Sequence, residues 1–501
     1  MATVYSDQAY PPSDRIYVRQ NMWSLETPNV WDPVSLAYAR AVREMQSRDP
    51  TDPTSWIYQA NIHGTYDPTP PGADWNQCQH ASWFFLPWHR MYIYWFERIV
   101  RSIVIDQGGP ADWALPYWNY SDSWPQQAAL PPGFREQTLP DGSANPLLVE
   151  NRNPVPPPGM NGGALLPQAP TSYAVAYSFT NFLPPPQPGF GSGPSAPTQF
   201  ENATGALENQ PHNIIHVLVG GPGDDECGGG WMSDAMCAAR DPIFWLHHSN
   251  IDRLWTNWLA LGGGRANPTD PAWLDQQFTF YDENGAQVVM KASDVLDTVT
   301  QLHYRYDDEA PPVARRAFAA REMVAAAGGN PPRLLAATEE PIELGSWPIT
   351  VSVGLPEEAK AVMSRVAAAP AEAPNTHLNV EGIQIDRDPG VVYEIYLNFP
   401  EADETADPHT HHFVGYVTTF GAQHHPRAAE QHQAPGGLRH TYDITNLVYE
   451  LTARGLWDED RVTVTFVPRG LLPPPGAPPA PRVEAGPQPR VRIGRVSVSS
   501  E

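Results

Sequence analysis

Two groups of histidines constrain the fold of this 501-residue chain more than any other feature. The first group is His63, His80 and His89, and the second is His212, His216, His247 and His248. His212 and His216 stand four residues apart in a helical pattern, so both rings project from one face of that helix. The other histidines lie on or beside aromatic segments. Such a pattern requires several helices to meet around a common polar centre.

Helical patterns of hydrophobic residues recur through the first part of the chain, at 34–48, 82–104, 205–221 and 241–264. The second pattern is apolar nearly all round after Pro87, as expected of a helix buried inside a bundle. The stretch 125–200 is rich in proline and glycine and is too long for a simple connector, so it predicts long irregular loops. We therefore expect residues 1–309 to form a mainly α domain, a four-helix bundle with long loops.

The pattern of the sequence changes after residue 346. Runs such as ITVSVGL, VVYEIYLNF and RVTVTFVPRG alternate between apolar and polar residues and are separated by turn residues. That alternation is typical of antiparallel strands with one buried face. We predict a C-terminal antiparallel β-sandwich at 346–501. A linker rich in alanine, arginine and proline at 310–345 is expected to join it to the helical domain.

Composition excludes several classes of function. The formal net charge of −25 opposes binding to nucleic acid and to an anionic membrane surface. No apolar stretch approaches the roughly 20 residues that a membrane-spanning helix needs. The first residues, MATVYSDQAYPPSDR, contain neither an apolar signal core nor a twin arginine, which favours a cytoplasmic location. The charge does not oppose a small uncharged substrate.

The histidines suit a pair of metal sites. His248 supplies a third ring to the helical pair, and His89 on its buried helix joins His63 and His80. A lone histidine is rarely a ligand, but two separate triads on aromatic segments favour metal binding. The sequence has neither an HExxH nor a CxxC motif, which argues against a zinc protease or a zinc ribbon. All-imidazole coordination suits copper, zinc or iron, with copper favoured for oxygen chemistry.

Several motifs resemble those of one family. The segments HGTYDP, CQHASWFFLPWHRMYIYWFE, PHNIIH and DPIFWLHHSNIDRLWTNW look like the two copper-binding regions of tyrosinases, catechol oxidases and haemocyanins. LNVEGIQIDRD, YDITNLV and VTVTFVPRG are similar to the C-terminal β domain of plant and bacterial polyphenol oxidases. Arg19, Tyr304 and Tyr306 resemble the arginine and tyrosine motifs that close the catalytic domain. The resemblance implies a type 3 centre of two copper ions, dioxygen as co-substrate and a small phenol as substrate.

The resemblance assigns the copper ligands residue by residue. His63, His80 and His89 correspond to the ligands of the first copper ion, and His212, His216 and His248 to those of the second. His247 and His248 form a histidine doublet. In this doublet the family pattern makes the second member, His248, the ligand, which leaves His247 as a neighbour. Cys78 stands two residues before His80, similar to the cysteine that forms a thioether with a copper histidine in fungal members. A small buried thiol is the alternative for Cys78.

The resemblance also implies residues that handle protons and admit substrate. Glu208 and Asn213 resemble the glutamate and asparagine that hold a water over the second copper in members that hydroxylate monophenols. The alternatives are a carboxylate favoured by the helix dipole for Glu208, and a hydrogen bond that fixes the His212 ring for Asn213. Ala235 falls at or near the family's gate position, which would contact substrate, and Phe244 is expected to pack against a copper histidine.

Three further features carry structural expectations. Asp252 and Arg253 are expected to form a buried ion pair behind the site. Cys227 and Cys237 match no motif, and buried free thiols are the default expectation for them. The β domain is expected to shield the copper entrance, although the sequence does not identify a side chain that plugs it.

The leading hypothesis is an enzyme that ortho-hydroxylates monophenols and oxidises o-diphenols to o-quinones. A catechol or o-aminophenol oxidase without the hydroxylation step is the alternative, and a haemocyanin-like oxygen carrier is less favoured. The sequence leaves open the natural phenol and whether the chain forms a homo-oligomer.

Overall fold

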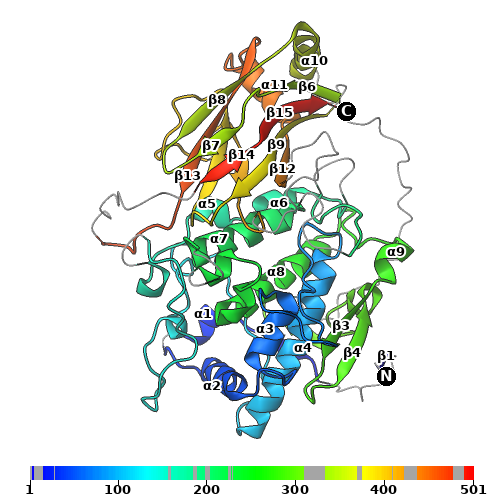
Figure 1. Cartoon of the computed structure of the whole chain (residues 1–501), viewed down its shortest axis with the longest axis vertical. Coiled ribbons are helices and arrows are strands. Elements are labelled where there is room, and N and C mark those ends of the chain that lie inside the picture. The colour runs from blue at the N-terminus through cyan, green and yellow to red at the C-terminus, as the bar shows by residue number, and fades with distance from the viewer. Residues whose placement is uncertain are drawn as a thin grey trace.

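The chain folds into a mainly helical domain and, above it in Figure 1, a β domain. The computed structural model describes residues 15–27, 29–155, 159–183, 189–197, 204–223, 227, 230–309, 333–368, 375–408, 410–422, 437–477 and 490–500, and the backbone of 3–4. Each domain has its own large hydrophobic core. The predicted fold class, an α domain followed by an antiparallel β domain, is confirmed.

The helical domain is organised around four helices that carry histidines. Its described helices are α1 (Met22–Leu25), α2 (Pro33–Ser47), α3 (Trp56–His63), α4 (Phe85–Asp106), α5 (Gln168–Thr171), α6 (Ala174–Ser178), α7 (Ile214–Gly220), α8 (Pro242–Ala260) and α9 (Pro271–Leu274). Helices α3, α4, α7 and α8 each hold at least one histidine of the two groups. Helix α4 packs against both α2 and α8. No described helix is both long and apolar enough to cross a bilayer.

The sequence explains where the long helices begin and what stabilises them. The side chain of Asp241 accepts a hydrogen bond from the backbone N–H of Ile243, and Pro242 occupies the first helical position of α8. Helix α2 begins in the same way at Asp32. Helix α4 has no side-chain cap and is buried on nearly every face, so packing stabilises it.

The third predicted helix, at 205–221, is divided into two parts. Residues Glu208–Asn213 form a π-helical segment, and α7 follows it directly. Pro211 lies inside that segment and lacks a backbone N–H, while Gln210 has φ −143° and ψ 121°, far from helical values. The helix is therefore interrupted just before His212.

Short strands complete the helical domain. β1 (Thr3–Val4), β4 (Gln287–Lys291) and β3 (Gln277–Tyr281) form one sheet, and β2 (Tyr17–Arg19) pairs in parallel with β5 (Tyr304–Tyr306). The β2–β5 pair brings residues from the beginning and the end of the domain together, and it places Arg19 opposite Tyr306.

The C-terminal domain is a sandwich of two antiparallel sheets. The first sheet has the order β11 (Phe413–Val417), β10 (Val392–Leu397), β13 (Arg461–Arg469), β8 (Ile349–Gly354). The second has the order β6 (Arg333–Ala337), β15 (Arg495–Ser500), β9 (Thr376–Ile385), β14 (Val491–Ile493), β7 (Ile342–Leu344), with β12 (Leu438–Asp443) paired to β9. Residues of both sheets share one core, for example Phe466 of β13 and Val380 of β9.

Two features of the β domain differ from the sequence-based expectation. Strands β6 and β7 lie inside the range 310–345 that was predicted to be linker, so the described part of that range from residue 333 belongs to the sandwich. Helices α10 (Glu357–Ala368) and α11 (Thr445–Ala453) were not predicted, and they pack against each other. Short strands and short helices carry too few residues to show a clear period.

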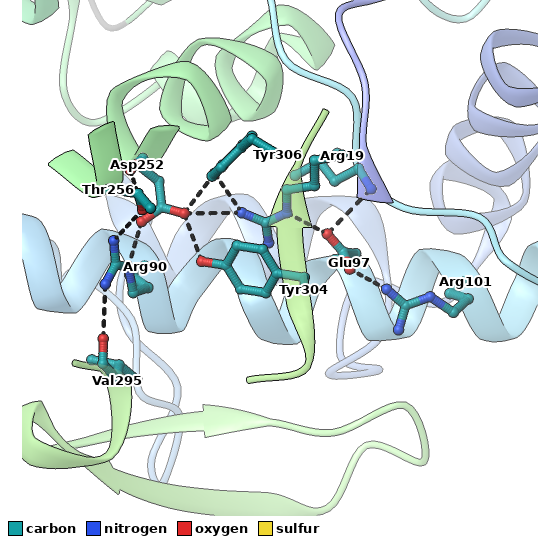
Figure 2. A network of polar contacts seen from close by, with 10 residues as sticks. Arg19, Arg90, Glu97, Arg101, Asp252, Thr256, Val295, Tyr304 and Tyr306 are labelled. Carbon is teal, nitrogen blue, oxygen red and sulfur yellow. Dashed lines mark hydrogen bonds and ion pairs between the residues drawn. The ribbon is translucent and has the colours of Figure 1, made fainter. Parts of the chain in front are cut away.

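A buried polar network joins α4 and α8 to β2 and β5 (Figure 2). Asp252 of α8 accepts hydrogen bonds from Arg90 of α4 at 2.5 Å, from Tyr306 at 2.5 Å and from Tyr304 at 2.6 Å. The guanidinium of Arg19 lies 3.2 Å from the same carboxylate and 3.7 Å from the Tyr304 ring centroid. Burial raises the pKa of Asp252, but the adjacent arginines outweigh this effect and hold it below its usual value.

The predicted pair of Asp252 with Arg253 is wrong. Arg253 instead binds Asp308 at 2.7 Å and Asp122 at 3.0 Å. Neighbouring residues on a helix point in directions about 100° apart, so they rarely face each other. The arginine partners of Asp252 come from α4 and from β2.

Candidate metal centre

The two histidine groups meet at one buried centre. The ligand-type atoms of His212, His216, His247 and His248 lie within 4.8 Å of one another, and so do those of His63, His89 and His248. A third set consists of His63, Cys78 and His80. All of these side chains are buried. His248 belongs to the first two sets and therefore joins the two groups.

Four rings are oriented by a hydrogen bond at Nδ1. Their acceptors are the carbonyl oxygens of Ala235 for His63 (2.8 Å), Phe85 for His89 (2.8 Å) and Met232 for His216 (2.7 Å), and the Asn213 side chain for His212 (2.8 Å). The Nε2 atoms of His63, His89 and His212 are buried without a hydrogen-bond partner. An acceptor at Nδ1 fixes the tautomer that leaves a lone pair on Nε2. These rings are therefore prepared to donate to a metal.

The centre keeps its imidazoles neutral. Burial lowers the pKa of His63 and of His212 to about 3. Burial also lowers the pKa of His80, His89, His216 and His248 well below the usual value. Neutral imidazole is the form that binds metals. The donor set of buried, neutral nitrogens fits copper.

Aromatic rings pack the histidines into position. The Phe244 centroid lies 4.8 Å from that of His63 and 4.3 Å from that of His248, which confirms the contact expected for Phe244. Phe85 lies 4.6 Å from His212 and 4.8 Å from His89. Each phenylalanine therefore bridges the two groups.

The doublet places two rings at the centre. The Nε2 atoms of His216 and His248 lie 3.4 Å apart, and the His89 and His248 rings stack with centroids 4.3 Å apart. His247 has one ring nitrogen 3.2 Å from the hydroxyl of Tyr120, while its Nε2 has no hydrogen-bond partner. Geometry alone does not choose between the two members of the doublet.

Glu208 lies between the two groups. Its carboxylate accepts hydrogen bonds from the backbone N–H of Ala81 at 2.6 Å and from the Ser192 hydroxyl at 3.1 Å. Ala81 directly follows His80, so Glu208 ties the segment of the first group to the helix of the second. Burial raises the pKa of Glu208 to about 8.

Cys78 and Ala235 have defined surroundings. Cys78 is buried, forms no disulfide, and its sulfur lies within 4.8 Å of a ring nitrogen of His80. Ala235 is fully buried, and its carbonyl oxygen holds His63. The structure gives Ala235 a backbone role that the sequence did not suggest. Its role as a gate stays a prediction.

Cys227 and Cys237, expected to be free thiols, form a disulfide. Their Cα atoms lie 6.2 Å apart, which a disulfide can span. The expectation was wrong because the sequence does not show that the ten-residue separation closes a loop.

Phe420 of the β domain reaches the centre and was missed by sequence reasoning. Its ring stacks on His216 at 4.1 Å and lies edge-on to His80 at 5.3 Å and to His212 at 5.7 Å. The side chain is 2% exposed. It follows β11 in a turn, and nothing in the local pattern VTTFGA distinguishes it from other strand-end aromatics.

Several contacts dock the β domain at this position. The backbone N–H of Gly223 in the helical domain donates to the carbonyl of Asp388 in the β domain at 3.2 Å. Within the β domain, the Thr419 hydroxyl donates to the carboxylate of Asp388 at 2.6 Å. The backbones of Leu165 and Leu472 exchange two hydrogen bonds across the boundary. Helix α7 also contacts β10. The segment before Phe420 is thereby fixed to the helical domain.

Comparison with known proteins decides the family. Residues 53–261 match the common central domain of tyrosinase, and residues 267–318 match the polyphenol oxidase middle domain. A tyrosinase of Hahella sp. is 33% identical over an alignment 522 positions long, which covers 96% of this chain and 99% of that protein. The chain belongs to the tyrosinase and polyphenol oxidase family. Residues 331–501 match a domain of unknown function.

Other members of this family extend the likeness to both domains. The chloroplastic polyphenol oxidase of Malus domestica is 31% identical over 469 aligned residues, which cover 86% of this chain and 72% of that protein. The solved structure of latent apple tyrosinase covers 100% of both chains with a TM-score of 0.61 and 26% identity. Tyrosinase-family proteins bind two copper ions at a type 3 centre and use dioxygen, and the buried histidines of this chain fit that centre.

The expected cytoplasmic location is not supported. Relatives from Malus domestica, Vitis vinifera and Prunus armeniaca are chloroplastic proteins. Disulfides such as the one between Cys227 and Cys237 are also rare in a reducing cytosol. The first residues of the sequence therefore do not establish where the protein works.

Proposed function

We propose that this tyrosinase-family chain hydroxylates monophenols at the ortho position and oxidises o-diphenols to o-quinones. Family membership supports copper-dependent oxidation of phenols, and the hydroxylation step is the finer proposal. The observation that carries it is Glu208, a fully buried carboxyl with a raised pKa between the two histidine groups.

The proposed ligands are His63, His80 and His89 for one copper ion, and His212, His216 and His248 for the other. The unpartnered Nε2 atoms of His63, His89 and His212 and the hydrogen bonds at their Nδ1 atoms support this assignment. Bound there, the two ions would take electrons from substrate, deliver them to dioxygen and act as Lewis acids. The chain itself excludes water from the centre, because every proposed ligand is buried among aromatic rings.

Hydroxylation requires the phenol to lose its proton, although a free phenol titrates near pH ~10. A carboxylate whose pKa is about 8 is a stronger base than an ordinary carboxylate, so it matches that task better. The hydrogen bonds from Ala81 and Ser192 hold the carboxyl of Glu208 in place. We assign proton handling to Glu208 and the orientation of the His212 ring to Asn213.

A catechol or o-aminophenol oxidase without hydroxylation is the second candidate. The hydrogen bond from the His212 ring to Asn213 favours it, because this contact gives Asn213 a purely orienting role. The two Glu208 hydrogen bonds equally suit a carboxyl that only ties two segments together.

Oxygen uptake on a monophenol and on its o-diphenol distinguishes the two candidates. The wild type should oxidise both, whereas Glu208→Gln should lose monophenol turnover more than diphenol turnover. Copper content of each variant is measured in parallel to exclude metal loss. An equal fall of both activities in Glu208→Gln at full copper content would contradict the proton-handling role of Glu208. Absence of monophenol turnover by the wild type would contradict the hydroxylation proposal.

The β domain is proposed to keep the full-length chain latent. The fully buried stack of Phe420 on His216 supports this, because a substrate ring would need the same face of the centre. Opening then requires the contacts around Asp388 to break.

A further inference from the structure

A disulfide closes a loop whose backbone contacts both halves of the metal centre. The described residues of this 227–237 loop are 227 and 230–237. The carbonyl oxygen of Met232 accepts a hydrogen bond from His216, and the carbonyl oxygen of Ala235 accepts one from His63. His63 belongs to the first histidine group and His216 to the second. One short loop therefore orients a ring in each group.

The loop backbone also lies against the ends of two histidine helices. A Cβ at Gly64, which follows His63, would lie 2.7 Å from the Ala235 carbonyl oxygen. A Cβ at Gly220, the last residue of α7, would lie 2.1 Å from the backbone nitrogen of Ser233. Real Cβ atoms do not approach neighbours so closely, so both positions require glycine. With no side chain between them, a displacement of the loop is transmitted directly to the helix ends.

Hydrogen bonds inside the 227–237 loop support its shape. The backbone N–H of Cys237 donates to Asp234 at 3.0 Å, and the Trp231 indole donates to the carbonyl of Cys227 at 3.0 Å. Each of these bonds exchanges with water at small net cost. The disulfide is the covalent tie between the two ends of the loop.

We propose that Cys227 and Cys237 are positioning residues of the copper centre. Their disulfide holds the two loop carbonyls where they keep the proton on Nδ1 and direct Nε2 of His63 and His216 toward the metals. Loss of such a partner behind a metal-binding histidine typically weakens metal affinity about 10–100-fold. This inference rests on the ligand assignment proposed above.

The test compares the full-length wild type with the Cys227→Ser/Cys237→Ser double variant. Peptide mapping without reductant first establishes the disulfide in the wild type, and two free thiols there would overturn the proposal. Both proteins are loaded with copper, and transfer of copper to a colorimetric chelator is followed well below the unfolding temperature. The double variant should release both ions about tenfold faster or more.

A matched control separates positioning from general stability. Val42→Ala removes buried side-chain atoms from α2, a helix that carries none of the clustered histidines, and should lower the unfolding temperature without changing copper release. Equal release by the double variant and wild type would overturn the proposal. So would equal acceleration by Val42→Ala, or acceleration for only one of the two ions.

A second measurement applies if the double variant does not fold. Copper-free wild type is treated with a phosphine, which gives two electrons to the disulfide, takes oxygen from water, and leaves two thiols. After removal of the phosphine without air, the chain is reloaded with copper. Retention equal to that of the untreated protein would overturn the proposal. A wild type that never holds two copper ions would instead contradict the ligand assignment.

Discussion

The Phe420 ring lies nearly parallel to the His216 imidazole, with the centroids 4.1 Å apart and the planes inclined by 19°. The two residues belong to different domains, and His216 is a proposed ligand of the second copper ion. A phenyl ring has the shape of the expected phenolic substrate. Phe420 therefore occupies the face of the centre that a substrate ring would need.

Replacing Phe420 with alanine should activate the full-length chain. Loss of a buried aromatic side chain removes about 2 kcal/mol of docking energy, equivalent to a roughly 30-fold larger open population. Diphenol turnover measured as oxygen uptake should rise by about that factor. Phe399→Ala, a partly buried position in the β domain, is the control and should leave turnover unchanged. If the Phe420→Ala variant stays latent, other contacts of the β domain block access to the metal centre.

Latency should depend on pH through Asp388. Burial, with the nearby Asp234 carboxylate adding to it, raises the pKa of Asp388 to about 7. A raised carboxyl pKa contributes stability that is fully present below the ordinary value of 3.8 and is lost as the pH rises through about 7. The docked form should therefore weaken as the pH rises from about 4 to about 7 and change little at higher pH, because the ionised carboxylate is buried near another acidic group.

The measurement is the activity of the full-length chain divided by that of Phe420→Ala at each pH. This ratio should rise several-fold between about pH 5 and 7 in the otherwise native chain and level off above about pH 8, because the docked and open forms bind different numbers of protons only up to the raised pKa of Asp388. In the Asp388→Asn chain this activity ratio should not change with pH. A ratio that rises equally in the Asn variant would locate the titrating group elsewhere.

Much of the site is predictable because it is encoded locally. The spacing of His212 and His216 places two rings on one face, and the helices around His89 and His248 carry continuous apolar patterns. The copper family, the fold class and the contact of Phe244 follow from those segments. The helices and the His212–His216 pair depend on helical period and residue type, whereas the copper family and the contact of Phe244 are implied by the resemblance of whole motifs.

The remainder depends on contacts between distant segments. Phe420 matters only because the β domain docks at Gly223, and no local pattern encodes that docking. The disulfide joins Cys227 and Cys237, whose spacing in the sequence matches no disulfide pattern. Asp252 and Arg253 are neighbours in sequence but face different partners, since adjacent positions on a helix diverge.

The two members of the histidine doublet should differ in copper binding. His248→Ala should lower copper content from two ions per chain toward one, since its Nε2 lies 3.4 Å from that of His216. His247→Ala should keep both ions, because the family motif makes the second histidine of the pair the ligand and one ring nitrogen of His247 already contacts the Tyr120 hydroxyl. Metal analysis after dialysis measures both. If the His247→Ala protein retains only one copper ion, His247 is the ligand and His248 is its neighbour.

Replacing Asp252 with asparagine should strongly destabilise the helical domain without removing a metal ligand. The carboxylate compensates the charge of Arg90 at 2.5 Å and of Arg19 at 3.2 Å, and both guanidinium groups are buried. Removing one partner of a buried ion pair costs about 3–5 kcal/mol, because the remaining charge has lost its compensation. Arg19 keeps Glu97 at 2.7 Å, whereas Arg90 keeps the neutral Val295 carbonyl and Thr256 hydroxyl, so Arg90 should account for most of the loss. Thermal unfolding of the copper-free protein measures the effect, and Asp308→Asn, at a partly exposed pair with Arg253, should cost far less. Equal costs would show that the network in Figure 2 adds no more stability than a surface pair.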